Sequence, residues 1–407
     1  MNRRRFLRGA AAFAAVGTVA GCGISLREGL RNECRSALPP ALAAHPLVTT
    51  AWCGIDAGQA VDVHCHVFGT GDSGSGLWFN PALERIVQPQ RYVQRLFFLN
   101  AGCVRDAPGN VDASVVDRLL NQCDALPRGY RLLLLAFDWA RDSAGAPMLE
   151  QSTFYVPDRY AASLARQHPD RFEWAASIHP LAPDALARLD KAAADGARAI
   201  KWLPSAQNID PASPRCDAFY RRQAELKLPL LTHAGDERAV RGHDESLGNP
   251  LRLRRPLDAG VRVIVAHCAS LGTGADLDRS GAPPVANFAL FARLFDTSAY
   301  RDHLYGDLSA VTQGNRIDVL VTLLERTDWH PRLLNGSDYP LPGVLPLIAL
   351  DTLAERRLLD PAAVPVLREI REHNVLLFDF VLKRSLASNG ARFADAVFET
   401  RRMLVPA

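Results

Sequence analysis

Short apolar runs alternate with amphipathic stretches along the chain from residue 61 onward. The runs are rich in Val, Ile, Leu and aromatic residues, which is typical of strands. They predict strands at 61–67, 131–137, 172–178, 197–203, 229–233, 261–267, 304–309 and 332–337. Apolar positions between them recur with the spacing of a helix face. That spacing predicts helices at 112–124, 158–168, 183–195, 215–227, 250–259, 284–296 and 315–326.

Eight strands that alternate with seven helices are the pattern of an α/β protein of the (β/α)8 TIM-barrel class. Residues 344–407 continue as helical sequence, so we expect a C-terminal helical extension on the outside of the barrel. A doubly wound open sheet is the alternative fold. Against it, no G-x-G-x-x-G motif follows the first strand, and the chain has no P-loop.

The first predicted strand, Val-Asp-Val-His-Cys-His-Val at 61–67, contains two histidines two positions apart. Alternate residues of a strand share a face, so Asp62, His64 and His66 are expected to project together, with Asp62 deeper in the barrel. Two imidazoles at the carboxyl end of a barrel strand suit a metal ion at the barrel mouth. A strand with two hydrogen-bonded core histidines is the alternative.

Further polar residues lie where later strands end. They are His179, Lys201, His233, His267, Asp307 and Asp338. The carboxyl ends of all barrel strands meet at the face that carries the active site, so these side chains are expected to converge there. Asp236 lies in the loop after His233, where substrate contacts are common. For each residue the alternative is a satisfied core side chain or, for Asp236, a solvated loop residue.

The N-terminus has the features of an export signal. Residues 3–8 read Arg-Arg-Arg-Phe-Leu-Arg, which resembles a twin-arginine signal, and residues 9–20 are apolar but too short to span a bilayer. Val-Ala-Gly-Cys at 19–22 then matches a lipoprotein cleavage box, which makes Cys22 the expected lipidation site. A plain secretory signal is the alternative. We therefore expect an export signal at 1–21, a lipid-anchored tether at 22–55, the barrel at 56–407, and a periplasmic, membrane-anchored location.

The charge balance gives no support for nucleic-acid binding. The formal net charge is +3, but without the four arginines of the signal the chain has 43 basic against 44 acidic residues. The sequence contains no basic stripe and no nucleic-acid motif. We expect a small-molecule substrate, membrane contact only through the lipid anchor, and an oligomeric state that is open.

The chain has eight cysteines and no C-x-x-C motif, which argues against a thiol redox centre. An oxidising compartment permits disulfides, and Cys34 with Cys53 is the pair that we expect. Cys65 and Cys268 each follow a presumed site histidine, so we expect both to point away from the site as buried thiols.

The order D-x-H-x-H, a lysine on the fourth strand, P-x-x-x-H, A-H-C and G-S-D-Y-P resembles the metal-dependent amidohydrolase superfamily, in its amidohydrolase-related branch. The resemblance covers residues 61 to about 380. It implies that His64, His66, His233 and Asp338 bind one divalent ion, most simply Zn²⁺. It further implies that the ion activates a water, that Asp338 accepts its proton, and that His267 polarises the substrate.

Lys201 has two candidate roles under this resemblance. Some members of the superfamily have a carbamylated lysine at this position, which bridges two metals. We favour one metal, with Lys201, His179, Asp236 and Asp307 as substrate contacts. A lysine at a strand end without a role in the site is a third reading.

The sequence therefore predicts a metal-dependent hydrolase that cleaves an amide, lactone or ester of a small organic molecule. The enzymatic alternative is a decarboxylase or hydratase of an aromatic or unsaturated acid. A non-catalytic solute-binding lipoprotein on the same barrel is the alternative from another class.

Overall fold

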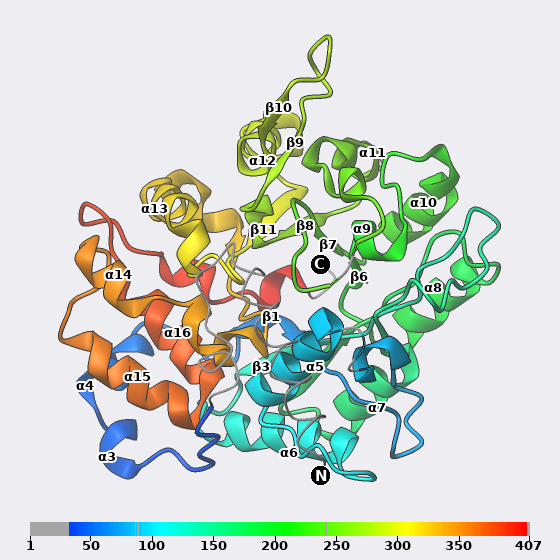
Figure 1. Ribbon diagram of the computed structural model, residues 1–407. Coiled ribbons are helices and arrows are strands. Elements are labelled where there is room, and N and C mark those ends of the chain that lie inside the picture. Colours follow the sequence, from blue (N-terminus) through cyan, green and yellow to red (C-terminus); the bar gives the residue numbers. More distant parts are fainter. Residues whose placement is uncertain (1–31, 86, 88, 241, 405–407) are drawn as a thin grey trace.

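The computed structural model describes residues 32–85, 87, 89–240 and 242–404 of the chain (Figure 1). The predicted export signal and Cys22 lie outside the described residues. Within the described residues, no helix is both long and apolar enough to cross a membrane.

Parallel strands form the centre of the molecule, and helices surround them (Figure 1). The strands are β1 (Val61–His66), β3 (Arg131–Leu135), β5 (Phe172–Ala175), β6 (Ile200–Trp202), β7 (Leu230–His233), β8 (Val263–Ala266), β11 (Leu304–Asp307) and β12 (Leu333–Leu334). They form two sheets, β1-β3-β5 and β6-β7-β8-β11-β12. Parallel bridges between Ala176 and Ile200 and between Cys65 and Tyr339 join the sheets at both edges. The ring closes, which confirms the (β/α)8 barrel.

The helices follow the strands in the predicted alternation. They are α3 (Pro40–Ala43), α4 (Pro46–Ala51), α5 (Pro89–Ala101), α6 (Val111–Asp124), α7 (Asp158–Gln167), α8 (Ala185–Ala194), α9 (Pro204–Gln207), α10 (Asp217–Glu225), α11 (Arg254–Asp258), α12 (Asn287–Phe295), α13 (Ile317–Glu325), α14 (Leu350–Glu355), α15 (Ala363–His373) and α16 (Val375–Ser385). The last three are the C-terminal extension. Pro157 precedes α7, and Gly196, with a φ of 85°, follows α8, as expected of helix boundaries.

Two apolar clusters place the core on both sides of the strands. A small inner cluster fills the barrel and includes Val61, Val63 and Leu133. A larger outer cluster lies between strands and helices and includes Cys65 and Cys268. Both thiols are buried and free, as predicted for cysteines that point away from the barrel interior.

The prediction that Asp62 shares a face with His64 and His66 is wrong. Val61 and Val63 both pack in the inner cluster, and the register of β1 against β3 shifts between Asp62 and Cys65. This irregularity breaks the alternation of β1, so Val63 and His64 both turn inward although they are adjacent. Asp62 turns to the other side, where the positive charge of Lys383 acts on its carboxylate.

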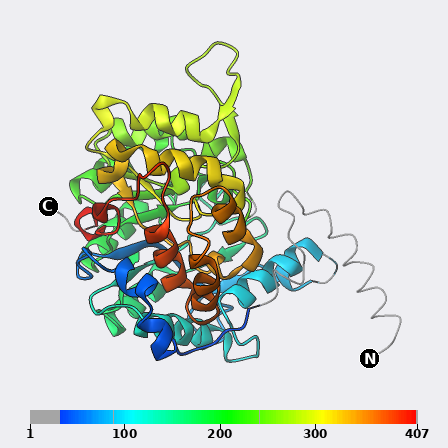
Figure 2. The same cartoon turned by 90° about the vertical axis from the view of Figure 1, so that its left-hand side faces the viewer.

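Several elements differ from the predicted ones. Most strands are shorter than predicted, at one end or at both. The predicted helix at 284–296 begins only at Asn287, since 284–286 pair with 273–275 as the hairpin β9 (Thr273–Ala275) and β10 (Pro284–Ala286). This hairpin projects from the body at the top of Figures 1 and 2. The short antiparallel pair β2 (Trp78–Phe79) and β4 (Phe154–Tyr155) and helix α5 were not predicted.

The lead-in before the barrel packs on the C-terminal extension. Trp52, after α4, stacks on Phe380 of α16, with ring centroids 3.8 Å apart. This packing holds Cys53 on the surface as a free thiol, while Cys34 bonds to Cys103, just after α5. The predicted Cys34–Cys53 disulfide is therefore wrong.

A buried ion pair connects α16 to the loop after β12. Lys383 Nζ lies 2.6 Å from Asp379 Oδ2 and donates a second hydrogen bond of 2.6 Å to the carbonyl oxygen of Gly336. Both side chains are almost fully buried. The C-terminal extension thus holds the loop that leads to Asp338.

Replacing Lys383 with methionine is expected to lower the free energy of unfolding by about 3–5 kcal/mol, because it leaves the Asp379 carboxylate buried without its cation. Lys191→Met is the matched control, since Lys191 and Asp195 form a lysine–aspartate pair of the same spacing on the surface. That change is expected to cost less than about 1 kcal/mol. Urea unfolding measures both, and equal costs would contradict a structural role for Lys383.

Candidate metal centre and active site

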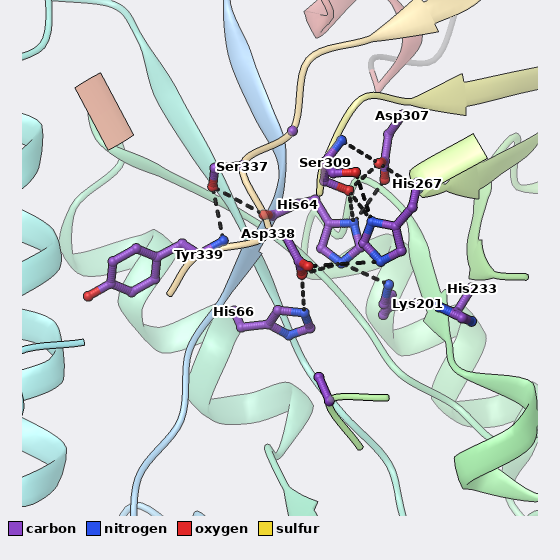
Figure 3. Close-up of polar contacts among 12 residues, drawn as sticks. His64, His66, Lys201, His233, His267, Asp307, Ser309, Ser337, Asp338 and Tyr339 are labelled. Atoms are coloured by element: carbon purple, nitrogen blue, oxygen red, sulfur yellow. Dashed lines mark hydrogen bonds and ion pairs between the residues drawn. The ribbon is translucent and has the colours of Figure 1, made fainter. Parts of the chain in front are cut away.

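The predicted site residues arrive from strands on both sides of the barrel (Figure 3). His64 and His66 end β1, Lys201 lies in β6, His233 ends β7, His267 follows β8, Asp307 ends β11, and Asp338 follows β12. Parallel strands present their carboxyl ends at one barrel face, which brings residues distant in sequence together. The convergence predicted from the strand ends is observed for this set.

Asp338 lies at the centre of the cluster. Its Oδ1 is 3.3 Å from His66 Nε2 and 3.5 Å from His64 Nε2, and its Oδ2 is 3.9 Å from His267 Nε2. One ligand atom each from His64, His66 and Asp338 lies within 4.8 Å of the others, which is close enough to hold one metal ion.

Asp307 orients two of the imidazoles. Its Oδ2 lies 2.8 Å from His64 Nδ1, and its Oδ1 accepts hydrogen bonds from the backbone N–H of His267 and from Ser309. The side chain is fully buried, so both oxygens are occupied by protein and substrate contact is not its role. We expected Asp307 to bind substrate. Its contacts instead favour a role in orienting the His64 ring, with Nε2 toward Asp338.

His267 has a defined orientation as well. Its Nδ1 lies 3.0 Å from the carbonyl oxygen of Ser309, which only an N–H can approach favourably. In the neutral ring Nε2 then carries a lone pair and faces Asp338. Burial lowers the pKa of His267 to about 3, which keeps the ring neutral. His267 is therefore a proton acceptor or a ligand first, and a donor only after it has taken up a proton.

Lys201 lies at the cluster and not at its edge. Its Nζ is 3.1 Å from His64 Nε2, and the side chain is buried. Burial lowers the pKa of Lys201 to about 8, although the charges of Asp307 and Asp338 act in the other direction. An amine with this pKa is partly neutral near pH 8, which is the form that carbamylation requires, and the two candidate roles of Lys201 both fit.

His233 is beside this cluster, with its ring 5.3 Å from that of His267. Its Nε2 lies 3.2 Å from Glu237 Oε2, and its buried Nδ1 has no hydrogen-bond partner. Burial raises the pKa of Glu237 to about 7. An imidazole nitrogen that is buried and unpaired is costly unless a ligand or ion meets it, so His233 fits the role of a further metal ligand.

The protonation states also fit a metal. Burial lowers the pKa of His66 to about 4 and that of His233 well below its usual range. Burial alone would raise the pKa of Asp338, but electrostatic interaction with the His267 and His64 rings and a hydrogen bond to His66 hold it well below the usual range. Neutral imidazoles around an ionised carboxylate are the state that binds Zn²⁺ and similar ions.

The backbone at these residues adopts unusual conformations. Asp338 has a φ of 61°, and His267, Cys268 and Ala269 have φ values of 55°, 51° and 49°. A side chain on Gly336 would begin 2.9 Å from the Cβ of His64, so only glycine lets the two segments approach. Asp62 stabilises this approach because its Oδ1 accepts hydrogen bonds from the N–H groups of His64 and Ser337. Such conformations concentrate at functional sites.

Two predicted substrate contacts have partners within the protein. His179 is fully buried, with Nε2 3.1 Å from the carbonyl oxygen of Gln207 and Nδ1 accepting from the N–H of Leu181. Both ring nitrogens are thereby occupied, so His179 has no free atom for a substrate. Asp236 is on the loop after β7. Its Oδ1 accepts a hydrogen bond of 3.4 Å from Asn287 Nδ2, and its Oδ2 lies 3.7 Å from Arg238 Nη2.

Replacing Asp307 with asparagine is expected to weaken metal binding by about 10- to 100-fold, because the carboxylate that orients the His64 ring is lost. Competition with a chromophoric chelator measures the affinity. Asp276→Asn is the control, since Asp276 is also a buried aspartate but pairs with Arg293, away from the site. Unchanged affinity in Asp307→Asn would contradict this role.

Sequence reasoning missed Arg316, which is buried beside Ser270 in the loop after β11. It is one of many arginines in the chain and belongs to no motif. Only the fold reveals that the loop carrying it packs against the residues after His267.

Solved structures of other proteins are similar to this chain at low sequence identity. A TIM-barrel protein of Bordetella bronchiseptica is 16% identical, with a TM-score of 0.44 over 76% of this chain and 98% of that one. A Pseudomonas putida protein described as a 2-pyrone-4,6-dicarboxylic acid hydrolase is 17% identical, with a TM-score of 0.43 over 79% and 97%. A 2,6-dihydroxybenzoate decarboxylase from Rhizobium is 14% identical, with a TM-score of 0.40 over 78% and 97%.

No curated protein matches the chain in a sequence comparison. The sequence model of one family does match, over residues 61–365, which include all of β1 to β12 and every residue of the cluster. The chain therefore belongs to the amidohydrolase family described by that model.

Proposed function

We propose that this protein is a metal-dependent hydrolase of a small organic amide, lactone or ester. The observation that carries the proposal is the position of Asp338, between His64 and His66 on one side and His267 on the other. His64, His66, His233 and Asp338 would hold one divalent ion, most simply Zn²⁺. When bound, such an ion supplies Lewis acidity, which lowers the pKa of water and polarises a carbonyl.

The chain's own residues would move the protons. Asp338 is ionised and central, so it would accept the proton of the attacking water. His267 Nε2, 3.9 Å away, would take that proton from Asp338 and return it to the leaving group. Asp307 would stabilise His64 and His267 in the orientation that leaves both Nε2 atoms facing the reaction.

Loops around the mouth would limit the access of water. The glycine-rich loop after β1 is held by Asp112, which accepts hydrogen bonds from the backbone of Thr70 and Gly71 and from the hydroxyls of Ser73 and Ser75. Beyond the loop, Trp78 contacts Trp139, and Trp139 stacks on Tyr155 at 4.2 Å. These contacts join the segment after the glycine-rich loop to the connection that follows β3.

A substrate panel tests the proposal. Wild type loaded with Zn²⁺ or Mn²⁺ is assayed on matched amides, lactones and esters, and aromatic carboxylic acids are assayed for release of CO₂. Hydrolysis that Asp338→Asn abolishes would support the hydrolase. Release of CO₂ alone would support the decarboxylase, and binding without turnover in any arm would support the solute-binding protein.

A further inference from the structure

Arg316 is a buried cation with unused hydrogen-bonding capacity. It ends the short 3-10 helix Gly314–Arg316, directly before α13, and is 8% exposed. Nη1 donates a hydrogen bond of 2.6 Å to Ser270 Oγ, and Nε is buried without a partner. Among the described residues no carboxylate forms an ion pair with it.

Two arginines elsewhere in the chain show the usual pairing of a guanidinium that is largely removed from water. Arg188 forms ion pairs of 2.8 Å with both Asp138 and Asp158. Arg118 donates hydrogen bonds to the backbone carbonyl oxygens of Arg35 and His373. A buried guanidinium that lacks such partners is costly, because its charge has lost water without gaining an anion. Arg316 moreover lies at the N-terminus of α13, whose dipole also favours a negative group. The location therefore has an excess of positive charge.

Arg316 lies beside the catalytic cluster. Its partner Ser270 closes the turn that begins at His267, with its N–H 3.0 Å from the His267 carbonyl oxygen. Burial lowers the pKa of Arg316, and the nearby charges of Asp338, Glu237 and Asp307 raise it. These carboxylates are close enough to act on the guanidinium but do not pair with it.

Arg238, an exposed arginine of the loop after β7, is a weaker candidate for an anion site. Arg238 is 60% exposed and already has Asp236 at 3.7 Å. Arg241 lies outside the described residues. A surface arginine of this kind contributes little to binding, because water and salt screen its charge.

We propose that Arg316 binds a carboxylate of the substrate, so that the enzyme acts on small organic acids whose cleaved bond is separate from that carboxylate. The guanidinium N–H groups match the two oxygens of a carboxylate, and Ser270 fixes the side chain in place. The assignment rests on the proposed function for the reaction but names a binding site that can be tested apart from it.

Catalysis provides the first test. Each ester, lactone and amide of the panel is offered as a free acid and as its neutral methyl ester or primary amide. Wild type is expected to prefer the acid, and Arg316→Met to raise KM for the acid by about 10- to 100-fold, the worth of a charge-assisted hydrogen bond. Arg316→Lys, which keeps the charge, is expected to restore part of the loss.

Arg371→Met is the matched control. Arg371 is also buried and has unpaired nitrogens, but it lies on α15, and the charge that acts on it is that of Arg368. This variant should keep the wild-type preference. An equal loss in both variants, or no loss in Arg316→Met, would overturn the proposal.

Binding separates this proposal from the reaction. Calorimetry on metal-loaded protein compares benzoate, phthalate and succinate with their neutral amides. Preference for at least one acid that Arg316→Met removes, with metal content unchanged, supports the carboxylate site even if the whole panel resists hydrolysis. A panel that resists hydrolysis would then contradict only the proposed hydrolase activity. Acids that bind no better than their amides would contradict the carboxylate site, whatever the hydrolysis assays show.

Discussion

Asp338→Asn is expected to lower kcat by about 10²- to 10⁴-fold, the range for removal of a positioned general base. Asparagine keeps the shape of aspartate and an oxygen that can face His64 and His66, but it cannot accept a proton. Because Asp338 is within 3.5 Å of both imidazoles, some loss of metal affinity is expected with the loss of rate. Rates are therefore measured at saturating metal, with the bound metal determined in the same samples.

The pH profile and a control complete this experiment. His267 keeps its position in Asp338→Asn, so the residual rate should rise with pH as hydroxide replaces the missing base. Asp360→Asn, at an exposed position before α15, should behave as wild type. A metal-loaded Asp338→Asn protein with more than about a tenth of the wild-type kcat would show that another group takes the proton, since a general base contributes at least 10²-fold.

His66→Ala is expected to abolish measurable activity because it removes one of the ligands of a site that must assemble its ion from a few side chains. His66 is the most suitable ligand to truncate, since its side chain is 21% exposed and its loss opens no large cavity in the core. Plasma mass spectrometry of the purified variant should find less metal than in wild type. Thermal unfolding should remain cooperative.

His168→Ala is the control for this variant. His168 follows α7 and packs its ring against Phe172, 5.7 Å away, far from the cluster in the described structure. Its replacement should leave metal content and activity unchanged. Full metal occupancy together with full activity in His66→Ala would exclude His66 from the centre.

The barrel and most of the cluster could be predicted because each rests on a local signal. Apolar runs fix the strands, and the histidines and Asp338 lie at strand ends, where parallel strands bring them together. Lys201 was predicted in the same way, and the structure places its amine against His64. The family match over residues 61–365 agrees with these motifs.

What failed depends on contacts that no local pattern encodes. The irregularity in β1 turned His64 to the side of Val63 and so away from the face of Asp62, although the sequence alternates regularly. Cys34 bonds to Cys103 because α5 brings them together, and α5 itself gave no clear helical pattern. Arg316 became a candidate only through its burial and the missing carboxylate, both of which are properties of the folded chain.

Metal titration tests whether the activity depends on one bound ion. Protein stripped with a chelator and dialysed is titrated with Zn²⁺ and, separately, with Mn²⁺, while hydrolysis of a substrate from the panel is followed. A site that holds one ion predicts no activity in the stripped protein and a linear rise that breaks at one equivalent of metal. A break at two equivalents would assign Lys201 to a bridging role. Full activity in the metal-free protein would contradict a metal-dependent reaction.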